Sequence, residues 1–210
     1  MATSTLILRV VALSAILIGS AAGGARAEQL TGSGLVAALR QGGYVLLMRH
    51  TRSPEARPDK IAADPENTNL ERQLDQVGRD TAGAMGEAIK KLRIPIGDVL
   101  SSPTYRALET VRLASLGRAQ GFAELGDGGQ SMQRVQEKPA EWLRKRVAEP
   151  PRAGTNTIMV THLPNITAAF GQAASAVDGE ALVFLPNGKG GAEFVARVKI
   201  EEWPALANEP

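Results

Sequence analysis

Two short apolar runs of this chain end at its only two histidines. Residues 44–48 (Tyr-Val-Leu-Leu-Met) lead into Arg49 and His50, and residues 157–161 (Thr-Ile-Met-Val-Thr) lead into His162. Runs of this length, bounded by polar or glycine positions, are typical of strands buried in a parallel sheet. The pattern therefore predicts two buried strands, each with a histidine at its carboxyl end.

The rest of the pattern alternates helices with strands. Residues 98–100 form a further short apolar run, and residues 180–186 and 193–200 alternate in polarity around a glycine-rich turn, which predicts a terminal hairpin. Apolar positions at helical spacing, with cap residues and proline stops, predict helices at residues 34–41, 75–92, 102–116 and 131–148, and a short one from about residue 165. The third of these helices is expected to begin with Ser102 as N-cap and Pro103 at its first position. The combination predicts an α/β fold, a three-layer sandwich with a mostly parallel central sheet and helices on both faces.

The first 27 residues have the features of a secretory signal peptide. An apolar stretch at residues 10–18 follows Arg9, and Ala25-Arg26-Ala27 supplies the small-x-small cleavage pattern. The competing interpretation is an uncleaved membrane anchor, but the apolar stretch is too short for a comfortable span. We therefore expect cleavage after Ala27, a single domain at residues 28–210, a periplasmic or secreted protein, and no stable membrane anchor.

Charge and cysteine content exclude several functions. The whole chain has 24 basic and 22 acidic residues, and removal of residues 1–27 takes away Arg9 and Arg26 and leaves 22 of each. A domain without excess positive charge gives no reason to expect a nucleic-acid partner. The chain has no cysteine, which excludes a thiol nucleophile, disulfides and cysteine-ligated zinc.

The residues that carry chemistry are expected to converge at one edge of the sheet. Ligands of parallel sheets bind beyond the carboxyl ends of the strands, where Arg49, His50 and His162 follow their strands and Arg106 lies in the first turn of a helix. Two guanidinium groups, two imidazoles and a helix N-terminus would form a cationic pocket suited to a phosphoryl group. The alternative is a two-histidine metal site, which the adjacent arginines would oppose. Neither a metal nor a cofactor is expected.

Several segments resemble a known family. Residues 47–51 (Leu-Met-Arg-His-Thr) are similar to the Arg-His-Gly signature of the histidine phosphatase superfamily, which includes the phosphoglycerate mutase-like enzymes. Residues 101–110 resemble its Ser-Ser-Pro-x-x-Arg-Ala-x-x-Thr stretch, residues 72–79 the opening of its first long helix, and residues 160–162 the strand that carries its second histidine. The resemblance covers about residues 43–170, in the order and at the spacing of the family.

The resemblance implies a phosphoglycerate mutase-like fold and a role for each site residue. It assigns His50 as the nucleophile that becomes phosphohistidine, and Arg49, Arg106 and His162 as the remaining phosphate pocket. Two further residues, Arg72 and Thr51, are predicted to contact the substrate. Thr51 replaces the usual glycine of the signature, and we expect threonine to be tolerated there because it adopts ordinary backbone angles.

The general acid has no distinctive motif. One branch of the family places an aspartate directly after its second histidine, but here Leu163 follows His162. Glu124, in a glycine-rich segment, is the favoured candidate, Glu180 at the start of the hairpin is the alternative, and His162 is the fallback.

The sequence therefore predicts an exported, metal-independent phosphatase that hydrolyses a phosphomonoester or a related phosphoryl group through a phosphohistidine. The alternatives are a phosphoryl-binding protein that kept the pocket with weak or lost turnover, and a phosphoglycerate-type mutase. The expected partner is a phosphorylated substrate, small or macromolecular. No segment of the sequence selects one substrate or an oligomeric state.

Overall fold

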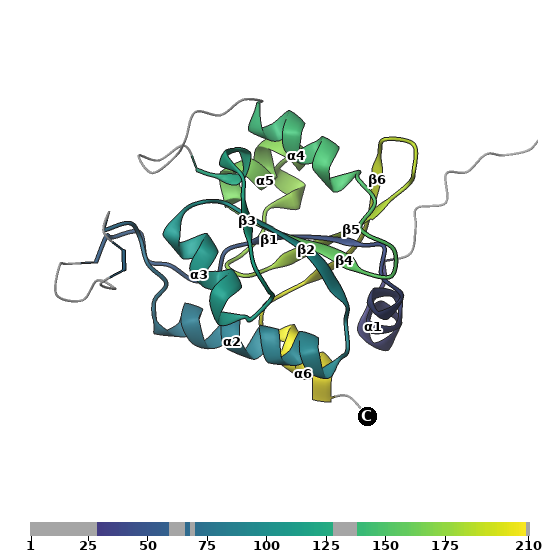
Figure 1. Ribbon diagram of the computed structural model, residues 1–210, viewed down its shortest axis with the longest axis horizontal. Coiled ribbons are helices and arrows are strands. Elements are labelled where there is room, and N and C mark those ends of the chain that lie inside the picture. The colour runs from purple at the N-terminus through teal and green to yellow at the C-terminus, as the bar shows by residue number, and fades with distance from the viewer. Residues whose placement is uncertain (1–28, 59–65, 68–69, 128–137, 209–210) are drawn as a thin grey trace, which may run out of the picture.

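A single six-stranded sheet forms the centre of the protein (Figure 1). The computed structural model describes residues 29–58, 66–67, 70–127 and 138–208, so the expected signal peptide and residues 131–137 of an expected helix lie outside the described residues. The strands are β1 (Val45–Arg49), β2 (Ile96–Ser101), β3 (Gln120–Gly121), β4 (Asn156–Thr161), β5 (Ala181–Pro186) and β6 (Ala192–Val198). They are ordered β3-β2-β4-β1-β5-β6. Strands β1 to β4 run parallel, and β5 pairs antiparallel with both β1 and β6.

Helices cover both faces of this sheet. Helices α1 (Gly32–Gln41), α2 (Gln76–Lys91), α3 (Tyr105–Leu113) and α6 (Glu202–Asn208) share one apolar cluster with the sheet. Helices α4 (Pro139–Val147) and α5 (Leu163–Phe170) share the other cluster. Figure 1 shows α4 and α5 on the opposite side of the sheet from α2 and α6. The predicted three-layer α/β sandwich is confirmed.

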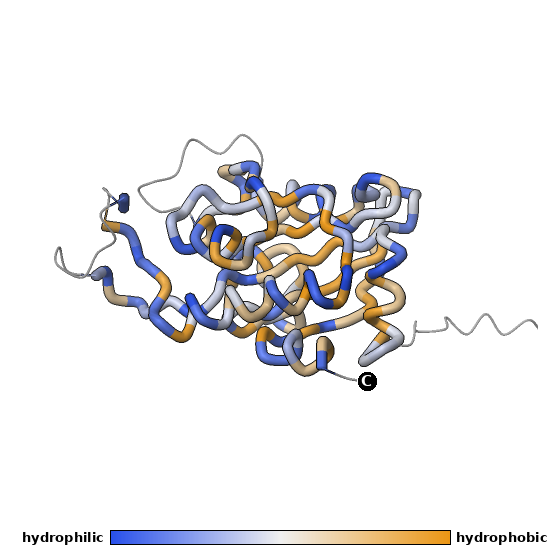
Figure 2. The backbone as a smooth tube through the Cα atoms, turned by 60° about the horizontal axis from the view of Figure 1, so that its bottom comes forward, coloured by the Kyte–Doolittle hydropathy of each residue, from blue (hydrophilic) through white to orange (hydrophobic). Residues whose placement is uncertain are grey.

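The period-two alternation of strand side chains divides the core into these two layers. In β1, Leu46 and Met48 face the cluster of α1 and α2, whereas Val45 and Leu47 face the cluster of α4 and α5. All four side chains are at most 2% exposed. Both faces of β1 are therefore buried, which explains its continuous apolar sequence. Figure 2 shows the hydrophobic colouring of the central strands.

Most element boundaries follow the sequence pattern closely. Helix α2, predicted at residues 75–92, spans Gln76–Lys91, and the carboxylate of Asp75 caps it by accepting a hydrogen bond of 2.8 Å from the amide of Gly78. The helix that carries Arg106 begins later than predicted: Thr104 is its N-cap, α3 starts at Tyr105, and Pro103 lies outside it. The Ser102 side chain does not cap α3 but bonds His162 and Thr104, as described below. The pattern also missed β3 and α6, both of which are short.

None of the helices in the described part of the chain is both long enough and apolar enough to cross a membrane.

Candidate active site

Neighbouring parallel strands bring the two histidines together. Strands β1 and β4 pair in register up to Arg49 and Thr161, and the His50 amide then donates to the Thr161 carbonyl at 3.0 Å. The His50 and His162 rings follow directly, with centroids 5.1 Å apart and an angle of 62° between the ring planes. Their exposed fractions are only 3% and 2%. The expected convergence at the carboxyl edge of the sheet is present.

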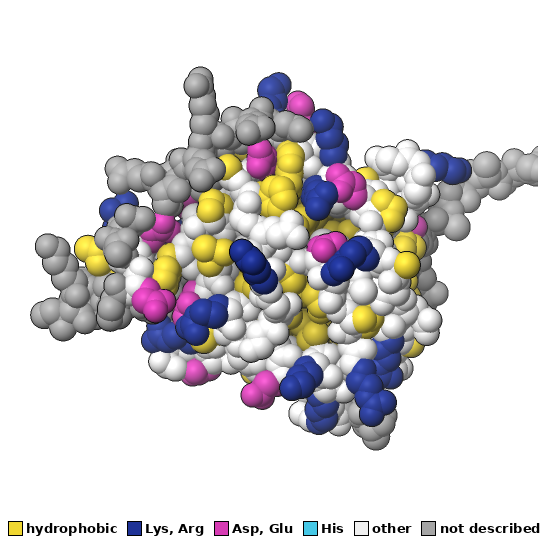
Figure 3. All heavy atoms as spheres, in the orientation of Figure 1, with side chains coloured by type: hydrophobic (Ala, Val, Ile, Leu, Met, Phe, Trp, Pro, Cys, Tyr) yellow, Lys and Arg dark blue, Asp and Glu magenta, His cyan; other side chains and the backbone are white. Residues whose placement is uncertain are grey.

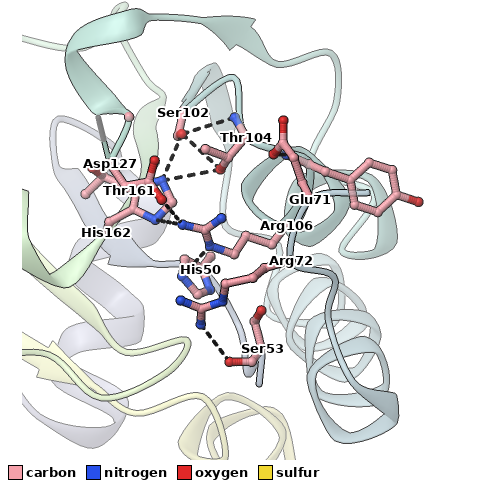
Figure 4. Close-up of polar contacts among 12 residues, drawn as sticks. His50, Ser53, Glu71, Arg72, Ser102, Thr104, Arg106, Asp127, Thr161 and His162 are labelled. Atoms are coloured by element: carbon pink, nitrogen blue, oxygen red, sulfur yellow. Dashed lines mark hydrogen bonds and ion pairs between the residues drawn. The ribbon is translucent and has the colours of Figure 1, made fainter. Parts of the chain in front are cut away.

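The guanidinium of Arg106 bridges the two imidazoles (Figure 4). Its Nε donates to Nε2 of His50 at 3.1 Å, and its Nη2 lies 3.1 Å from Nδ1 of His162. A guanidinium has donors only, so both of these ring nitrogens act as acceptors. Each imidazole therefore directs an unprotonated nitrogen at the same cation.

The other ring nitrogens complete an ordered network. Nδ1 of His50 lies 2.7 Å from the Thr51 carbonyl oxygen, so it carries the proton and donates it there. Nε2 of His162 lies 2.9 Å from the Ser102 hydroxyl, which also donates to the Thr104 hydroxyl at 3.0 Å. The two histidines are thus held as opposite neutral tautomers, and the site fixes which nitrogen of each is free to react.

Burial and neighbouring charges keep both rings neutral. The pKa of the His50 imidazole falls from 6.5 to about 3, chiefly because burial disfavours its charged form, and the charges of Arg106 and Arg49 act in the same direction. The hydrogen bond to the Thr51 carbonyl opposes this lowering. Burial, and then the Arg106 charge, also lowers the pKa of His162 well below its usual range.

Arg72 lies in the same cluster, and its predicted contact with substrate stays a prediction. Figure 4 shows its guanidinium beside His50. Backbone acceptors hold it there, because Nη2 donates to the Ser53 carbonyl and Nε to the Pro54 carbonyl, each at 2.9 Å. Burial, followed by the Arg106 charge, lowers the pKa of Arg72.

Arg49 contacts the segment between α5 and β5. Its Nη2 forms an ion pair of 2.8 Å with Asp178, and its Nη1 donates to the Ala176 carbonyl at 3.3 Å. Both side chains of the ion pair are partly exposed, 24% for Arg49 and 33% for Asp178. Sequence reasoning found Arg49 but missed its partner.

Carboxylates occupy three donor groups around the predicted arginine cluster. Asp127 forms an ion pair with Nη2 of Arg106, and Asp178 pairs with Arg49. At the start of α3, Glu71 Oε2 accepts from the Tyr105 amide at 2.8 Å. These three carboxylates formally balance the charges of Arg49, Arg72 and Arg106. The arginine side of the site was predicted from motifs, whereas the acidic residues lie in segments without a motif.

Strand β4 and helix α5 hold the segment that carries Asp127. The Thr161 hydroxyl donates to the Leu125 carbonyl at 2.7 Å, and the Asn165 side-chain amide donates to the Gly126 carbonyl at 2.6 Å. Asn165 therefore neither caps α5 nor enters the pocket. These tertiary contacts hold the backbone just before Asp127, whose carboxylate pairs with Arg106.

The remaining predicted residues occupy different surroundings. Glu124 is buried in a 3-10 helix (Ala123–Leu125), three residues before Asp127. Glu180 is 2% exposed, pairs with Arg197 at 3.2 Å and accepts from the Val177 amide at 2.9 Å, so its carboxylate is already engaged.

Thr51 is fully buried, and its hydroxyl lies 3.2 Å from that of Thr110. Threonine is tolerated here as expected, because Thr51 does not have a positive φ. Among the described non-glycine residues, those at positive φ are Leu70, Arg93 and Ser115. The Thr51 carbonyl accepts the hydrogen bond from Nδ1 of His50. The predicted contact of Thr51 with substrate stays a prediction.

Comparison with known proteins gives a likeness in fold. No family model matches the chain, and no curated protein sequence matches it. Among solved structures, the protein histidine phosphatase SixA complexed with tungstate is 18% identical, with a TM-score of 0.54 over 76% of this chain and 98% of that one. A protein from Nakamurella multipartitia assigned as a phosphohistidine phosphatase SixA is 19% identical, with a TM-score of 0.52 over 75% and 95% of the two chains. A protein from Escherichia coli assigned as an alpha-ribazole-5'-P phosphatase is 16% identical, with a TM-score of 0.50 over 73% and 95%.

These structures belong to the histidine phosphatase superfamily, and the described residues adopt its phosphoglycerate mutase-like fold. The fold expected from the resemblance of residues 43–170 is confirmed.

Proposed function

We propose that this chain is an exported, metal-independent phosphatase that hydrolyses a phosphomonoester or a related phosphoryl group through a phosphohistidine at His50. The observation that carries the proposal is the state of the His50 Nε2 atom, which lacks a proton and lies 3.1 Å from the Arg106 guanidinium. A neutral imidazole nitrogen is a competent nucleophile without further activation. The low pKa of His50 keeps it neutral at physiological pH.

Two displacements at phosphorus complete the reaction. In the first, the Arg106 Nε–H turns from Nε2 of His50 to a phosphoryl oxygen, and the freed Nε2 lone pair attacks phosphorus. The N–P bond forms, and the P–O bond to the leaving group breaks while that oxygen takes up a proton. In the second, water attacks the phosphohistidine and gives a proton back to the acid that protonated the leaving group. The N–P bond breaks, and phosphate leaves with His50 restored. Positive charge on the imidazole is stabilised by its Nδ1–H bond to the Thr51 carbonyl. Charge on the equatorial oxygens is stabilised by Arg106, Arg49 and Arg72, the electrostatic contribution that dominates phosphoryl transfer.

The leaving-group proton comes, we infer, from Asp127. Its carboxylate contacts Arg106 and is 28% exposed, whereas Glu180 is committed to Arg197. A phosphoryl dianion that binds Arg106 displaces Asp127 from its cation, and a carboxylate that loses a cation and gains a negative neighbour binds a proton more strongly. Glu124 stays the general acid predicted from the sequence.

The central test uses the mature chain, residues 28–210, with an aryl phosphate in the presence of a chelator. We expect turnover, an acid-labile phosphoryl label on the protein after rapid quenching, and loss of both in His50→Ala. Phosphate binding without turnover would instead support a binding protein that kept the pocket. Transfer of the phosphoryl group to a second acceptor rather than to water would support the mutase.

Export is tested separately from catalysis. Expression of the full chain in a bacterium with a periplasm should yield a periplasmic protein whose sequence begins at Glu28. Retention in the cytoplasm with residues 1–27 intact would contradict the signal peptide.

A further inference from the structure

Asp178 pairs with Arg49, one of the three arginines that stabilise the phosphoryl group in the proposed reaction. We propose that Asp178 competes with the phosphoryl group for Arg49. The phosphoryl group has to replace the Asp178 carboxylate, and this competition weakens retention of the phosphate product. The proposal rests on the function proposed above and adds a residue that determines how strongly this site binds its product.

The ion pair of Arg49 uses one guanidinium nitrogen, and the Asp178 side chain is partly exposed. Only Nη2 of Arg49 contacts the carboxylate, and within the described part of the chain its Nε is buried without a hydrogen-bond partner. A carboxylate that matched the guanidinium fork would engage two nitrogens. The Asp178 side chain is 33% exposed although Oδ1, the atom paired with Arg49, is buried, so a phosphoryl ligand displaces this carboxylate by turning it toward solvent.

The segment around Asp178 is fixed from both sides. Arg197 donates to the carbonyls of Ala173 at 3.1 Å and Ser175 at 2.7 Å, and its guanidinium also pairs with Glu180 at 3.2 Å. The buried Glu180 carboxylate in turn accepts from the Val177 amide. Asp178 is therefore held between anchored neighbours, and its carboxylate loses little conformational freedom when it pairs with Arg49.

Gly179 connects the segment of Asp178 to the backbone of His50. The Gly179 amide donates to the His50 carbonyl at 3.0 Å, and its φ of 74° favours glycine. A Cβ at this position would lie 2.9 Å from the Ile200 side chain. The turn that presents Asp178 is thus joined directly to the nucleophile's own backbone.

A competitor at this position weakens substrate and product alike. Every phosphoryl ligand loses the same Asp178–Arg49 interaction and also meets the negative charge of the aspartate. Uniformly weaker binding raises KM and the dissociation constant of phosphate without changing the chemical step. An enzyme whose product is a strongly charged anion gains faster product release from such a residue.

The experiment measures binding of inorganic phosphate by calorimetry, which requires no turnover. Asp178→Asn should bind phosphate about fivefold to tenfold more tightly than wild type, because a partly exposed charge pair has been removed. Asp178→Glu keeps the charge and should stay within about twofold of wild type. The matched control is Asp98→Asn, since Asp98 is 32% exposed and pairs with Arg152 at 3.3 Å outside the site; its phosphate affinity should not change.

The Arg49→Gln variant separates direct competition for Arg49 from a general effect of the Asp178 charge on phosphate binding. In Arg49→Gln, the Asp178→Asn substitution should tighten phosphate binding by no more than about twofold, because the competed group is absent. Equal affinities of wild type and Asp178→Asn, weaker binding by Asp178→Asn, or no binding by either would overturn the proposal. Phosphate binding by wild type without any turnover would overturn the phosphatase but leave Asp178 as a competitor.

Discussion

At the scale of single residues, Arg106 connects the other groups of the site. Its Nε and Nη2 atoms contact His50, His162 and Asp127 at once. A planar fork can bridge two rings in this way, whereas an ammonium group offers one nitrogen. The same geometry fixes the tautomers of both histidines, so the reactivity of His50 depends on a neighbour 56 residues away.

Arginine-to-lysine substitutions test this role of the fork. Arg106→Lys should lower kcat/KM by roughly 10²–10³, because one ammonium cannot serve both imidazoles and the phosphoryl group. Arg49→Lys should lower it by at least about tenfold, equivalent to about 1.4 kcal/mol. Arg112→Lys, in the same helix but exposed and paired with Glu109, is the control and should leave the kinetics unchanged. Wild-type kinetics for both site variants would exclude a bidentate role.

The identity of the general acid is decided by substrates that differ in their leaving groups. An alkoxide needs protonation as it departs, whereas an activated nitrophenolate does not. Asp127→Asn should therefore slow hydrolysis of an alkyl phosphate by about 10²-fold or more and that of nitrophenyl phosphate by only about threefold. Steady-state rates of Glu124→Gln and Glu180→Gln on both substrates complete the comparison. A selective loss in Glu124→Gln alone would favour the acid predicted from sequence.

At the scale of elements, two close contacts place the chemistry. The end of β4 and the start of α5 hold the backbone of residues 124–126, which aims Asp127 at Arg106. On the other face, α2 approaches the end of α3 so closely that a Cβ on Gly86 would lie 1.9 Å from the Ala114 carbonyl oxygen. This contact sets the position of the helix that carries Arg106.

Alanine substitutions at two glycines of α2 test the close approach. Gly86→Ala should lower the free energy of unfolding by about 1–3 kcal/mol, because the added methyl group meets backbone that has to move. Gly83→Ala is the matched control, since a Cβ there meets nothing within 4 Å. Its better helix propensity should raise the free energy of unfolding by about 0.5–1 kcal/mol. Urea denaturation measures both, and equal changes in the two variants would contradict the close packing of α2 on α3.

At the scale of the whole molecule, the face shown in Figure 3 carries side chains of both charges. Figure 3 shows Lys and Arg side chains spread over this face, several of them beside Asp or Glu. In the site, Arg106 pairs with Asp127 and Arg49 with Asp178. The two histidines carry no charge of their own to be paired, because the folded protein holds both of them neutral and buried.

Stability should accordingly fall as the solution becomes acidic. The pKa of His50 is about 3 in the folded protein and 6.5 when unperturbed, so the unfolded chain binds the additional proton between these values. The contribution of the histidines to the free energy of unfolding is therefore fully present above pH 6.5 and decreases below it, by up to about 1.4 kcal/mol per pH unit for each histidine. Between pH 6.5 and about 5 the carboxylates contribute little. Denaturation of the His50→Asn, His162→Asn double variant should lack this slope, and an unchanged slope would show that other groups cause it.

The sequence by itself determined the layered α/β fold, because continuous apolar runs require strands buried on both faces and the segments between them have helical spacing. It also determined which strand ends carry His50 and His162, and the motif at residues 101–110 located Arg106. These features depend on local pattern, which a single sequence displays. The tertiary structure alone decided that Asp127, Asp178 and Glu71 occupy the donors of the site, and that the two imidazoles hold opposite tautomers. Each of these depends on contacts between segments far apart in the chain, so no local pattern could specify them.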